Sequence, residues 1–384
     1  MEKLTLTTGQ TDIARRMIAV NHPGIISSVK KNERLYIDDG NLIFEIIKAE
    51  KEQIVVEAKN NGTVLPGKGI NLPDTDIKIA TISDKDKKDI KTAAKLKVDY
   101  IALSFVRSGD DIIEARKLIK KYGGDQSIIA KLEKREAIES LDDIMLLADG
   151  VMVARGDLGV EMPFAELPNL QKKIIRLANY HHKPVIVATQ MLESMRFSPR
   201  ATRAEVNDIA TAVFDFVDAV MLSAETATGK FPFEAVTVMS KVIEATEKVS
   251  QKSKVDIEKH FIRSAITQAI AGSVSSIQKQ LEAKVIFAFT TSGYTATLIS
   301  NLFPPQPIIA LTSNERVLTK MSLLRSVYSI KASQPSSFNN IMTTVNEKSK
   351  KHKLARENEM VLITGGAPFG SNAGTNFMLI HKLK

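Results

Sequence analysis

Short apolar runs alternate with segments of helical periodicity through the middle of the chain. Each run has the length of one buried strand and ends at polar or glycine residues. Buried strands that each lead into a helix are typical of a parallel sheet. The five predicted strands are residues 100–106, 127–132, 150–154, 184–189 and 218–223. The helices predicted between them are residues 110–121, 136–147, 164–180 and 202–214.

The first part of the chain, up to about residue 70, has the pattern of an all-β unit. Residues 34–37 and 42–47 are predicted strands that flank a turn containing Gly40, as in a β-hairpin. Residues 53–58 form another predicted strand. A single hairpin is marginally stable in water, so these strands require partners. A new pattern begins near Lys68, and Ser83 opens a predicted helix with capping-box-like spacing.

The pattern changes again near residue 232, where two long helical segments begin a smaller α/β unit. These segments cover residues 233–250 and 261–281. Strands and helices then alternate, except that a glycine-rich loop joins the last two strands. The strands predicted here are residues 284–289, 307–312, 327–331, 359–364 and 376–381. The predicted domains are therefore residues 1–67, 68–231 and 232–384.

Polar side chains follow four successive strands of the central unit. Lys131 and Glu133 close one strand, and Asp157, Thr189 and Ser223 follow the next three. The pattern alone fits an open sheet as well as a closed barrel, and a barrel needs eight strands where five are counted. Convergence of polar groups at the carboxyl ends favours a barrel mouth. The predicted fold is a TIM-type β/α barrel, incomplete, with a small all-β domain and a C-terminal three-layer α/β domain.

The residue types at these strand ends suggest a metal site beside a phosphoryl group. Lys131 and Glu133 are two residues apart, so they point to the same side of an extended chain. Asp157 follows Gly156 directly after a buried run. One ammonium and two carboxylates suit a divalent cation and an anionic group. Taken singly, Gly-Asp fits a plain turn and Lys-x-Glu fits a solvated edge, so the interpretation depends on their order.

Composition excludes several other classes of protein. Of 384 residues, 43% are hydrophobic and 25% charged, which is typical of a soluble globular protein. The sequence has no cysteine, no apolar run long enough to span a membrane and no signal-peptide pattern, so we expect a cytoplasmic protein. The net charge of +9 is dispersed and aromatic residues are only 5%, so no nucleic-acid partner is expected. The positive charge suits anionic substrates.

Short sequence motifs follow one another in a fixed order at and around these strand ends. The most specific reads Ala-Thr-Gln-Met-Leu-Glu-Ser-Met and is followed by Pro-Arg-Ala-Thr-Arg-Ala-Glu-Val. The motifs lie at residues 68–73, 102–107, 131–133, 152–161, 188–195, 199–206 and 218–227. Read together, from about Leu4 to the C-terminus, the chain resembles the pyruvate kinase family.

The resemblance implies Mg²⁺-dependent phosphoryl transfer from phosphoenolpyruvate to ADP, giving pyruvate and ATP. It implies that Glu133 and Asp157 hold Mg²⁺ and that Lys131 neutralises the phosphoryl group in transfer. Gly156 and Asp157 would offer backbone N–H groups to the substrate. Thr189 would contact the carboxylate end of the substrate, near the place where the enolate is protonated. A hydroxyl or water relay is needed to protonate the enolate of pyruvate, and Thr189 and Ser223 are placed to serve it. The alternative for Thr189 is a capping hydroxyl at a turn.

The sequence departs from the family pattern in one large way. The family begins with about three further β/α strands, which carry an arginine, an Asn-x-Ser-His and an Asp-Thr-Lys-Gly stretch. These stretches bind the phosphoryl group and K⁺, and neither occurs in this sequence. We therefore expect little kinase activity. Open sheet edges should cause the chain to associate or to be poorly soluble. K⁺ dependence stays open. The alternatives are a non-catalytic fragment with effector-binding or subunit-association roles, and a metal-dependent lyase forming a pyruvate enolate.

A hydroxyl-rich loop in the C-terminal domain is a candidate effector site. Hydroxyls and backbone N–H groups at a helix start can bind an anion. In the family this loop receives the phosphate of a sugar-phosphate effector, although Tyr294 here replaces a common arginine, and residues 365–370 could close over it. The alternative is an ordinary polar turn. The family is usually tetrameric, so a homotetramer is expected. The predicted effector-binding residues are Thr290, Thr291, Ser292, Gly293 and Thr295.

Overall fold

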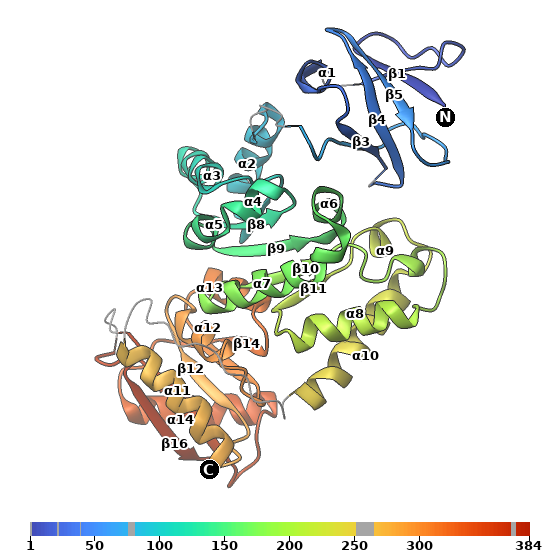
Figure 1. Ribbon diagram of the computed structural model, residues 1–384. Helices are drawn as coiled ribbons and strands as arrows, with labels where there is room; N and C mark the ends of the chain where they lie inside the picture. Colours follow the sequence, from blue (N-terminus) through green and yellow to red (C-terminus); the bar gives the residue numbers. More distant parts are fainter. Residues whose placement is uncertain (1, 21–22, 39, 76–80, 251–264, 370–373) are drawn as a thin grey trace.

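The computed structural model describes residues 2–20, 23–38, 40–75, 81–250, 265–369 and 374–384. Three sheets organise these residues (Figure 1). A small β unit lies at one end of the molecule, the central sheet follows it, and the C-terminal sheet lies at the other end.

The small unit is a six-stranded sheet with the strand order β2-β1-β5-β4-β3-β6. Its strands pair antiparallel except β1 with β2, and the alternate side chains that face inward, such as Leu35, Ile46 and Ile54, form the core. The predicted hairpin is present as β3 and β4. The expectation of an all-β unit needs one correction, because residues Pro23–Ser28 form helix α1. The strands are β1 Lys3–Thr7, β2 Met17–Ala19, β3 Arg34–Ile37, β4 Leu42–Ala49, β5 Gln53–Ala58 and β6 Ile70–Asn71.

The central sheet has five parallel strands in the order β11-β10-β9-β8-β7. All five correspond to strands predicted from the apolar runs. Strand β7 ends three residues earlier than predicted, because Phe105 adopts a left-handed backbone conformation with φ 54°. The strands are β7 Tyr100–Leu103, β8 Ser127–Leu132, β9 Gly150–Ala154, β10 Val185–Ala188 and β11 Ala219–Met221.

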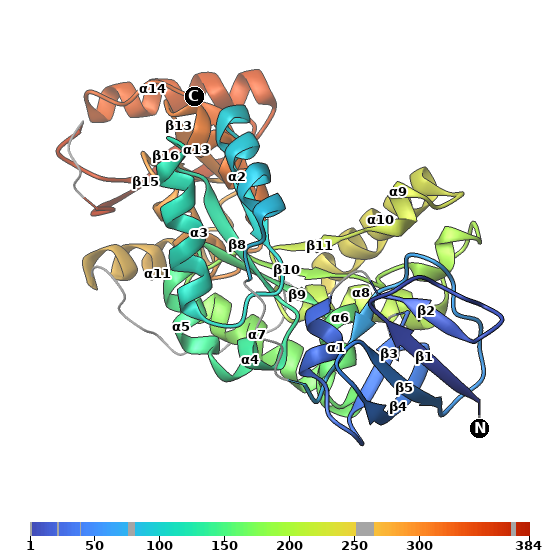
Figure 2. The ribbon, with the colours of Figure 1, turned by 90° about the horizontal axis from the view of Figure 1, so that it is seen from above.

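Helices follow each strand of the central sheet, and α2 and α3 lie side by side next to it (Figure 2). Ser83 forms the expected capping box with Asp86 at the start of α2. The predicted helix at 136–147 is wrong as one element, because it breaks at Ser140 into α4 and α5. The helices are α2 Asp84–Leu96, α3 Gly109–Lys121, α4 Arg135–Glu139, α5 Leu141–Leu147, α6 Arg155–Glu161, α7 Leu167–Tyr180, α8 Arg203–Phe214, α9 Ala224–Ala227 and α10 Pro232–Ser250. Three-residue and four-residue 3₁₀ turns cover Phe164–Glu166 and Glu193–Arg196.

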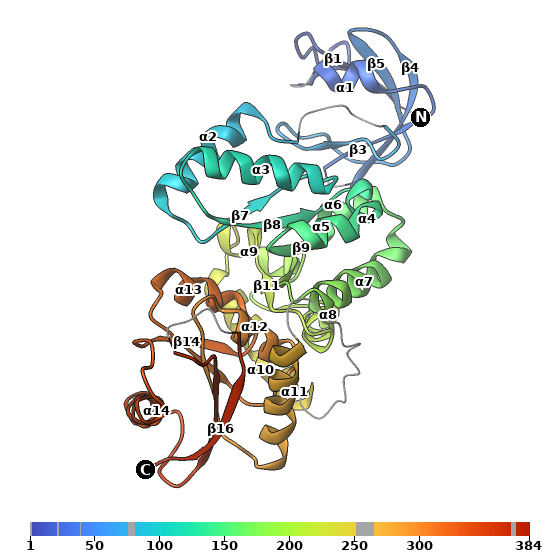
Figure 3. The ribbon, with the colours of Figure 1, turned by 90° about the vertical axis from the view of Figure 1, so that its left-hand side faces the viewer.

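The C-terminal sheet has the order β14-β13-β12-β15-β16, with only β16 antiparallel. Side chains of alternate strand residues pack against α11 and α12 on one face and against α14 on the other (Figure 3). Residues 261–264 of the predicted helix at 261–281 lie outside the described residues. The elements are α11 Ala265–Gln280, β12 Ile286–Phe289, α12 Tyr294–Ser300, β13 Ile308–Thr312, α13 Glu315–Lys320, a 3₁₀ turn Met321–Leu323, β14 Val327–Lys331, α14 Phe338–His352, β15 Met360–Gly365 and β16 Phe377–Lys382.

The C-terminal sheet unit packs against the amino ends of the central strands. The Tyr100 hydroxyl donates to the carbonyl of Lys320 at 3.1 Å, at the start of β7. The backbone N–H of Arg325 donates to Asp218 at 3.1 Å, directly before β11. The carboxyl ends of the same strands are therefore left for the polar residues of the candidate site.

Candidate active site

Lys131 and Glu133 contact each other at the carboxyl end of β8. The Lys131 Nζ atom lies 2.5 Å from Oε1 of Glu133, as their two-residue spacing predicted. The Glu133 side chain is only 1% exposed, whereas that of Lys131 is 25% exposed. A buried carboxylate requires a compensating charge or hydrogen bond, and Lys131 supplies both.

The end of β7 completes the surroundings of this pair. The backbone N–H of Phe105 donates to Oε2 of Glu133 at 2.7 Å, and Lys131 Nζ donates to Oγ of Ser104 at 2.9 Å. Phe105, whose N–H makes the first of these contacts, has the left-handed backbone that follows the strand. Ser104 was not among the predicted site residues, although a hydroxyl directly after a buried strand was a signal for it.

Gly156 and Asp157 lie in the first turn of α6, next to the Glu133 segment. Strands β8 and β9 pair with Leu132 opposite Val153, so Glu133 and Asp157 follow neighbouring strand ends. The sequence analysis predicted no helix between residues 154 and 164, and the structure forms one that begins at Arg155. The Gly156 N–H donates to Oγ1 of Thr189 at 2.7 Å, so this N–H is engaged within the protein.

Thr189 lies directly after β10 and has a left-handed backbone, with φ 68°. Its hydroxyl donates to the carbonyl of Ala188 at 2.6 Å and accepts from Gly156. A β-branched residue rarely adopts this conformation, which is found where surrounding contacts enforce it. The hydroxyl therefore joins the ends of β9 and β10.

Ser223 follows β11, beside the buried carboxylate of Glu225. Glu225 accepts the Ser223 N–H at 2.8 Å and the Leu192 N–H at 3.1 Å. Its 1% exposure shows that this carboxylate is a structural bridge between the segments that follow β10 and β11. The two backbone N–H groups account for a buried carboxylate at this position.

A second ion pair ties α6 to the segment after β8. Lys134 Nζ lies 2.5 Å from Oε1 of Glu161, and the Glu161 side chain is nearly buried. Burial raises the pKa of Glu161, while the hydrogen bond from Lys134 opposes that rise. The pair holds together the two segments that carry Glu133 and Asp157.

The donor set fits a small hard cation that keeps part of its hydration. Carboxylate oxygens are the ligands that Mg²⁺ prefers, and one or two carboxylates commonly suffice. Within the described residues, no cluster of three or more Asp, Glu, His or Cys side chains forms a ready metal cage. Two carboxylates therefore leave room for water and substrate oxygens.

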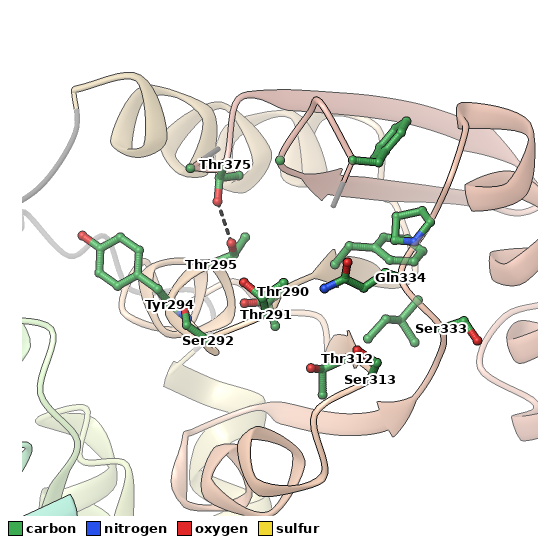
Figure 4. A pocket seen from close by; sticks show the side chains of 16 residues that line it. Thr290, Thr291, Ser292, Tyr294, Thr295, Thr312, Ser313, Ser333, Gln334 and Thr375 are labelled. Atoms are coloured by element: carbon green, nitrogen blue, oxygen red, sulfur yellow. Dashed lines mark hydrogen bonds between the residues drawn. The ribbon is translucent and has the colours of Figure 1, made fainter. Parts of the chain in front are cut away.

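The hydroxyl-rich loop of the C-terminal domain lines a cavity of about 290 Å³. Figure 4 shows Thr290, Thr291 and Gln334 facing a common space, with the Tyr294 ring directed away from it. Gly293 has φ 86°, and its N–H donates to Oγ1 of Thr290 at 2.9 Å. The loop thus uses part of its own hydrogen-bonding capacity.

The far side of this cavity comes from the segments around β15 and β16. The hydroxyls of Thr295 and Thr375 are 2.6 Å apart, and Gly366 and Phe369 also line the space. The predicted covering loop extends to Gly370, which lies outside the described residues.

Among the described helices, none combines the length and apolar character needed to cross a membrane.

The chain matches the models of one protein family and is similar to members of that family. Residues 2–236 match the model described as pyruvate kinase, barrel domain, and residues 268–381 match pyruvate kinase, alpha/beta domain. A pyruvate kinase of Thermotoga maritima is 38% identical over 379 residues, which cover 99% of this chain and 80% of that protein. A pyruvate kinase of Agrobacterium vitis is 40% identical over 360 residues, which cover 94% of this chain and 75% of that protein. A pyruvate kinase of Geobacillus stearothermophilus is 37% identical over 389 residues, which cover 99% of this chain and 65% of that protein.

Proposed function

The chain belongs to the pyruvate kinase family, and from this we propose that it transfers the phosphoryl group of phosphoenolpyruvate to ADP. The products of this phosphotransferase reaction are pyruvate and ATP. The observation that carries the proposal for this site is the contact between Lys131 and Glu133 at the end of β8, beside the segment of Asp157. A cation and an acid at one strand end suit a reaction in which a phosphoryl group moves.

Glu133 and Asp157 would hold Mg²⁺, which supplies positive charge to phosphate oxygens when it is bound. Both oxygens of Glu133 already accept hydrogen bonds, from Lys131 and from the Phe105 N–H. The hydrogen bond from the Phe105 N–H would fix the carboxylate before any ligand arrives, whereas the Lys131 ammonium would have to give up its oxygen to the ion. Fixed orientation of a ligand oxygen favours binding, since less freedom is lost.

Lys131 would stabilise the negative charge of the phosphoryl group in transfer. Its side chain is partly exposed, unlike that of Glu133, so the ammonium can reach a ligand. Positioned charge is the main contribution of a protein to phosphoryl transfer. The Ser104 hydroxyl also holds the ammonium, by accepting a hydrogen bond from Lys131 Nζ at 2.9 Å.

The substrate would lie against Gly156, Asp157 and Thr189. A Cβ atom added at Gly156 would lie 3.4 Å from Oγ1 of Thr189, so a side chain here would crowd the hydroxyl. Protonation of the pyruvate enolate requires a hydroxyl or a water relay, for which Thr189 and Ser223 are our candidates. The Thr189 hydroxyl is held in place by contacts on both sides.

The five parallel strands support assignment of residues 68–231 to an incomplete TIM-type β/α barrel. Strands β7 and β11 stand at the two ends of the strand order, with about five of eight strands present. Residues 1–67 would be the lid domain and residues 232–384 the C-terminal domain. A homotetramer follows from family membership as a further proposal. K⁺ dependence is likewise a proposal from family membership alone.

The cavity of the C-terminal domain is proposed to bind a sugar-phosphate effector. The exposed hydroxyls of Thr291 and Ser292 would face the phosphate, with Thr290, Gly293 and Thr295 shaping the loop. The cavity contains hydroxyl and amide groups from four segments, and these are suitable donors for phosphate oxygens. The absence of the family's arginine, replaced by Tyr294, predicts weaker binding of a doubly charged phosphate.

A coupled assay tests the proposed activity. Phosphoenolpyruvate, ADP and Mg²⁺ are supplied, and pyruvate is followed through lactate dehydrogenase. We expect ADP-dependent pyruvate formation. Glu133→Gln should lower it about 100-fold or more, whereas the control Glu139→Gln, an exposed carboxyl, should not change it. No ADP-dependent pyruvate from the unmodified chain, or equal activity of Glu133→Gln, would contradict the proposal.

A further inference from the structure

Arg155 joins three elements around the proposed site. Its Nη1 atom donates to Oδ2 of Asp208 in α8 at 2.5 Å, and its Nη2 atom donates to the backbone carbonyl of Thr189 at 2.8 Å. The Nη2 atom also lies 2.7 Å from Sδ of Met191. The Arg155 side chain is only 11% exposed. It therefore acts inside the protein rather than on a ligand in solvent.

The segment that Arg155 contacts has an unfavourable backbone. Thr189 has φ 68° and Gln190 has φ 53°, so two consecutive residues other than glycine are left-handed. Such conformations persist only where the surrounding contacts determine them. Here the Arg155 guanidinium holds the carbonyl of Thr189, and the next residue, Gly156, holds its hydroxyl through the backbone N–H.

The guanidinium suits this task for geometric and electrostatic reasons. Its planar fork reaches two acceptors at fixed angles, whereas a lysine ammonium acts as a point charge on a flexible stem. Asp208 balances its positive charge. Arg155 can therefore fix the turn without competing with Lys131 for an anionic substrate.

We propose that Arg155 is a positioning residue that holds the Thr189 hydroxyl in place for protonation of the enolate. This inference rests on the proposed function. In that step the enolate π electrons form a C3–H bond with the incoming proton, and the C2–O⁻ group becomes the carbonyl of pyruvate. The proton comes from the Thr189 hydroxyl, which rotates away from the Ala188 carbonyl to give it, and is replaced from solvent. Arg155 does not exchange a proton itself.

Two measurements on the full chain test this role. The first is exchange of the pyruvate methyl protons with D₂O in the presence of Mg²⁺, followed by ¹H NMR, which reports proton transfer without phosphoryl transfer. The second is amide hydrogen exchange measured by mass spectrometry on peptides covering residues 155–159 and 188–192. The variants are Arg155→Met and the conservative Arg155→Lys, with the exposed Arg176→Met as a matched control.

We expect Arg155→Met to slow methyl exchange at least tenfold and to speed amide exchange in both peptides at least tenfold. Peptides covering β12 should stay within twofold, which separates local loosening from global unfolding. Arg155→Lys should recover part of both effects, because one hydrogen bond can re-form. If Arg155→Met does not fold, Arg155→Lys is judged by itself, and we expect its methyl exchange to slow and its amide exchange in both peptides to speed up by more than twofold.

Unchanged methyl exchange and unchanged amide exchange in both Arg155 variants would overturn the inference. Faster amide exchange with normal methyl exchange would also overturn it, since the arginine would then be structural only. An unmodified chain that exchanges no pyruvate protons would instead contradict the proposed function. The amide measurement would in that case still decide whether Arg155 holds the turn.

Discussion

The ammonium of Lys131 lies 2.5 Å from a carboxylate oxygen of Glu133, and this carboxylate is almost completely buried. The pair thus neutralises itself before a ligand binds. A cation that binds Glu133 must compete with the ammonium for the same oxygen. Loss of that oxygen would make the ammonium available to an anionic group. This relationship links metal binding and phosphate recognition in one local exchange of partners.

Replacing Lys131 with methionine should therefore separate metal binding from catalysis. We expect Lys131→Met to bind Mn²⁺, used as a probe for Mg²⁺, several-fold more tightly, because the competing ammonium is gone. Turnover should fall about 100-fold or more, because the charge on the migrating group loses its partner. Isothermal titration and the coupled assay measure the two effects. The exposed Lys173→Met is the control, and weaker Mn²⁺ binding by Lys131→Met would contradict the exchange of partners.

The hydrogen bond from the Gly156 N–H to the Thr189 hydroxyl provides a second test. Thr189→Val removes the acceptor of the Gly156 N–H and should lower the free energy of unfolding by about 1 to 3 kcal/mol. Thr189→Ser keeps the oxygen and should stay close to the unmodified chain. Urea unfolding measures stability, and pyruvate methyl exchange should follow the same order. Equal behaviour of the valine and serine variants would show that the hydroxyl has no part in either property.

Asp218, at the junction of the central and C-terminal sheets, should make stability depend on pH. Burial raises the pKa of Asp218 to about 6 from its ordinary 3.8, although the N–H groups of Val185 and Arg325 donate to the carboxylate. The folded state then holds the proton more tightly than the unfolded chain. This contribution to stability is fully present below about pH 4 and is lost as pH rises through about 6.

Comparison with Asp218→Asn isolates this effect from other titrating groups. Relative to that variant, the unmodified chain should lose on the order of 1 to 3 kcal/mol of unfolding free energy between pH 4 and 7. Urea unfolding at several pH values provides the measurement. A constant difference between the two proteins across this range would show that the carboxyl has an ordinary pKa.

The C-terminal cavity predicts binding of a sugar phosphate that depends on two exposed hydroxyls. We expect the double variant Thr291→Val/Ser292→Ala to weaken binding about 100-fold or more, because two hydrogen bonds to a charged group are lost and each is worth about 1.5 to 3 kcal/mol. Titration calorimetry with a panel of sugar phosphates, and inorganic phosphate as competitor, measures the change. Ser322→Ala, outside the cavity, is the control. Equal affinity of the double variant would place the phosphate elsewhere.

The order of strands and helices was predictable because burial leaves a clear pattern. Apolar runs in β8, β9 and β10 are buried on both faces, so each reads as a continuous hydrophobic stretch. Helix α6 was missed because Gly-Asp-Leu-Gly has the composition of a turn. Tertiary packing overrides that local preference. The break at Ser140 was missed because apolar residues continue across it.

The contacts that shape the site were only partly predictable. The pairing of Lys131 with Glu133 follows from local spacing along a strand. The contacts of Arg155 join residues 34 and 53 positions apart and depend on the left-handed backbone of Thr189. No local preference favours threonine in that conformation. Such a contact emerges only when the strands and α8 are assembled.

The central claim is that Glu133 and Asp157 share one Mg²⁺ ion. Mn²⁺ binding followed by electron paramagnetic resonance tests it directly, with the unmodified chain, Glu133→Gln, Asp157→Asn and the double variant. We expect one site, a loss of affinity of at least tenfold in each single variant, and no further large loss in the double variant, because both carboxylates serve the same ion. Unchanged affinity in either single variant, or losses that simply add, would contradict it.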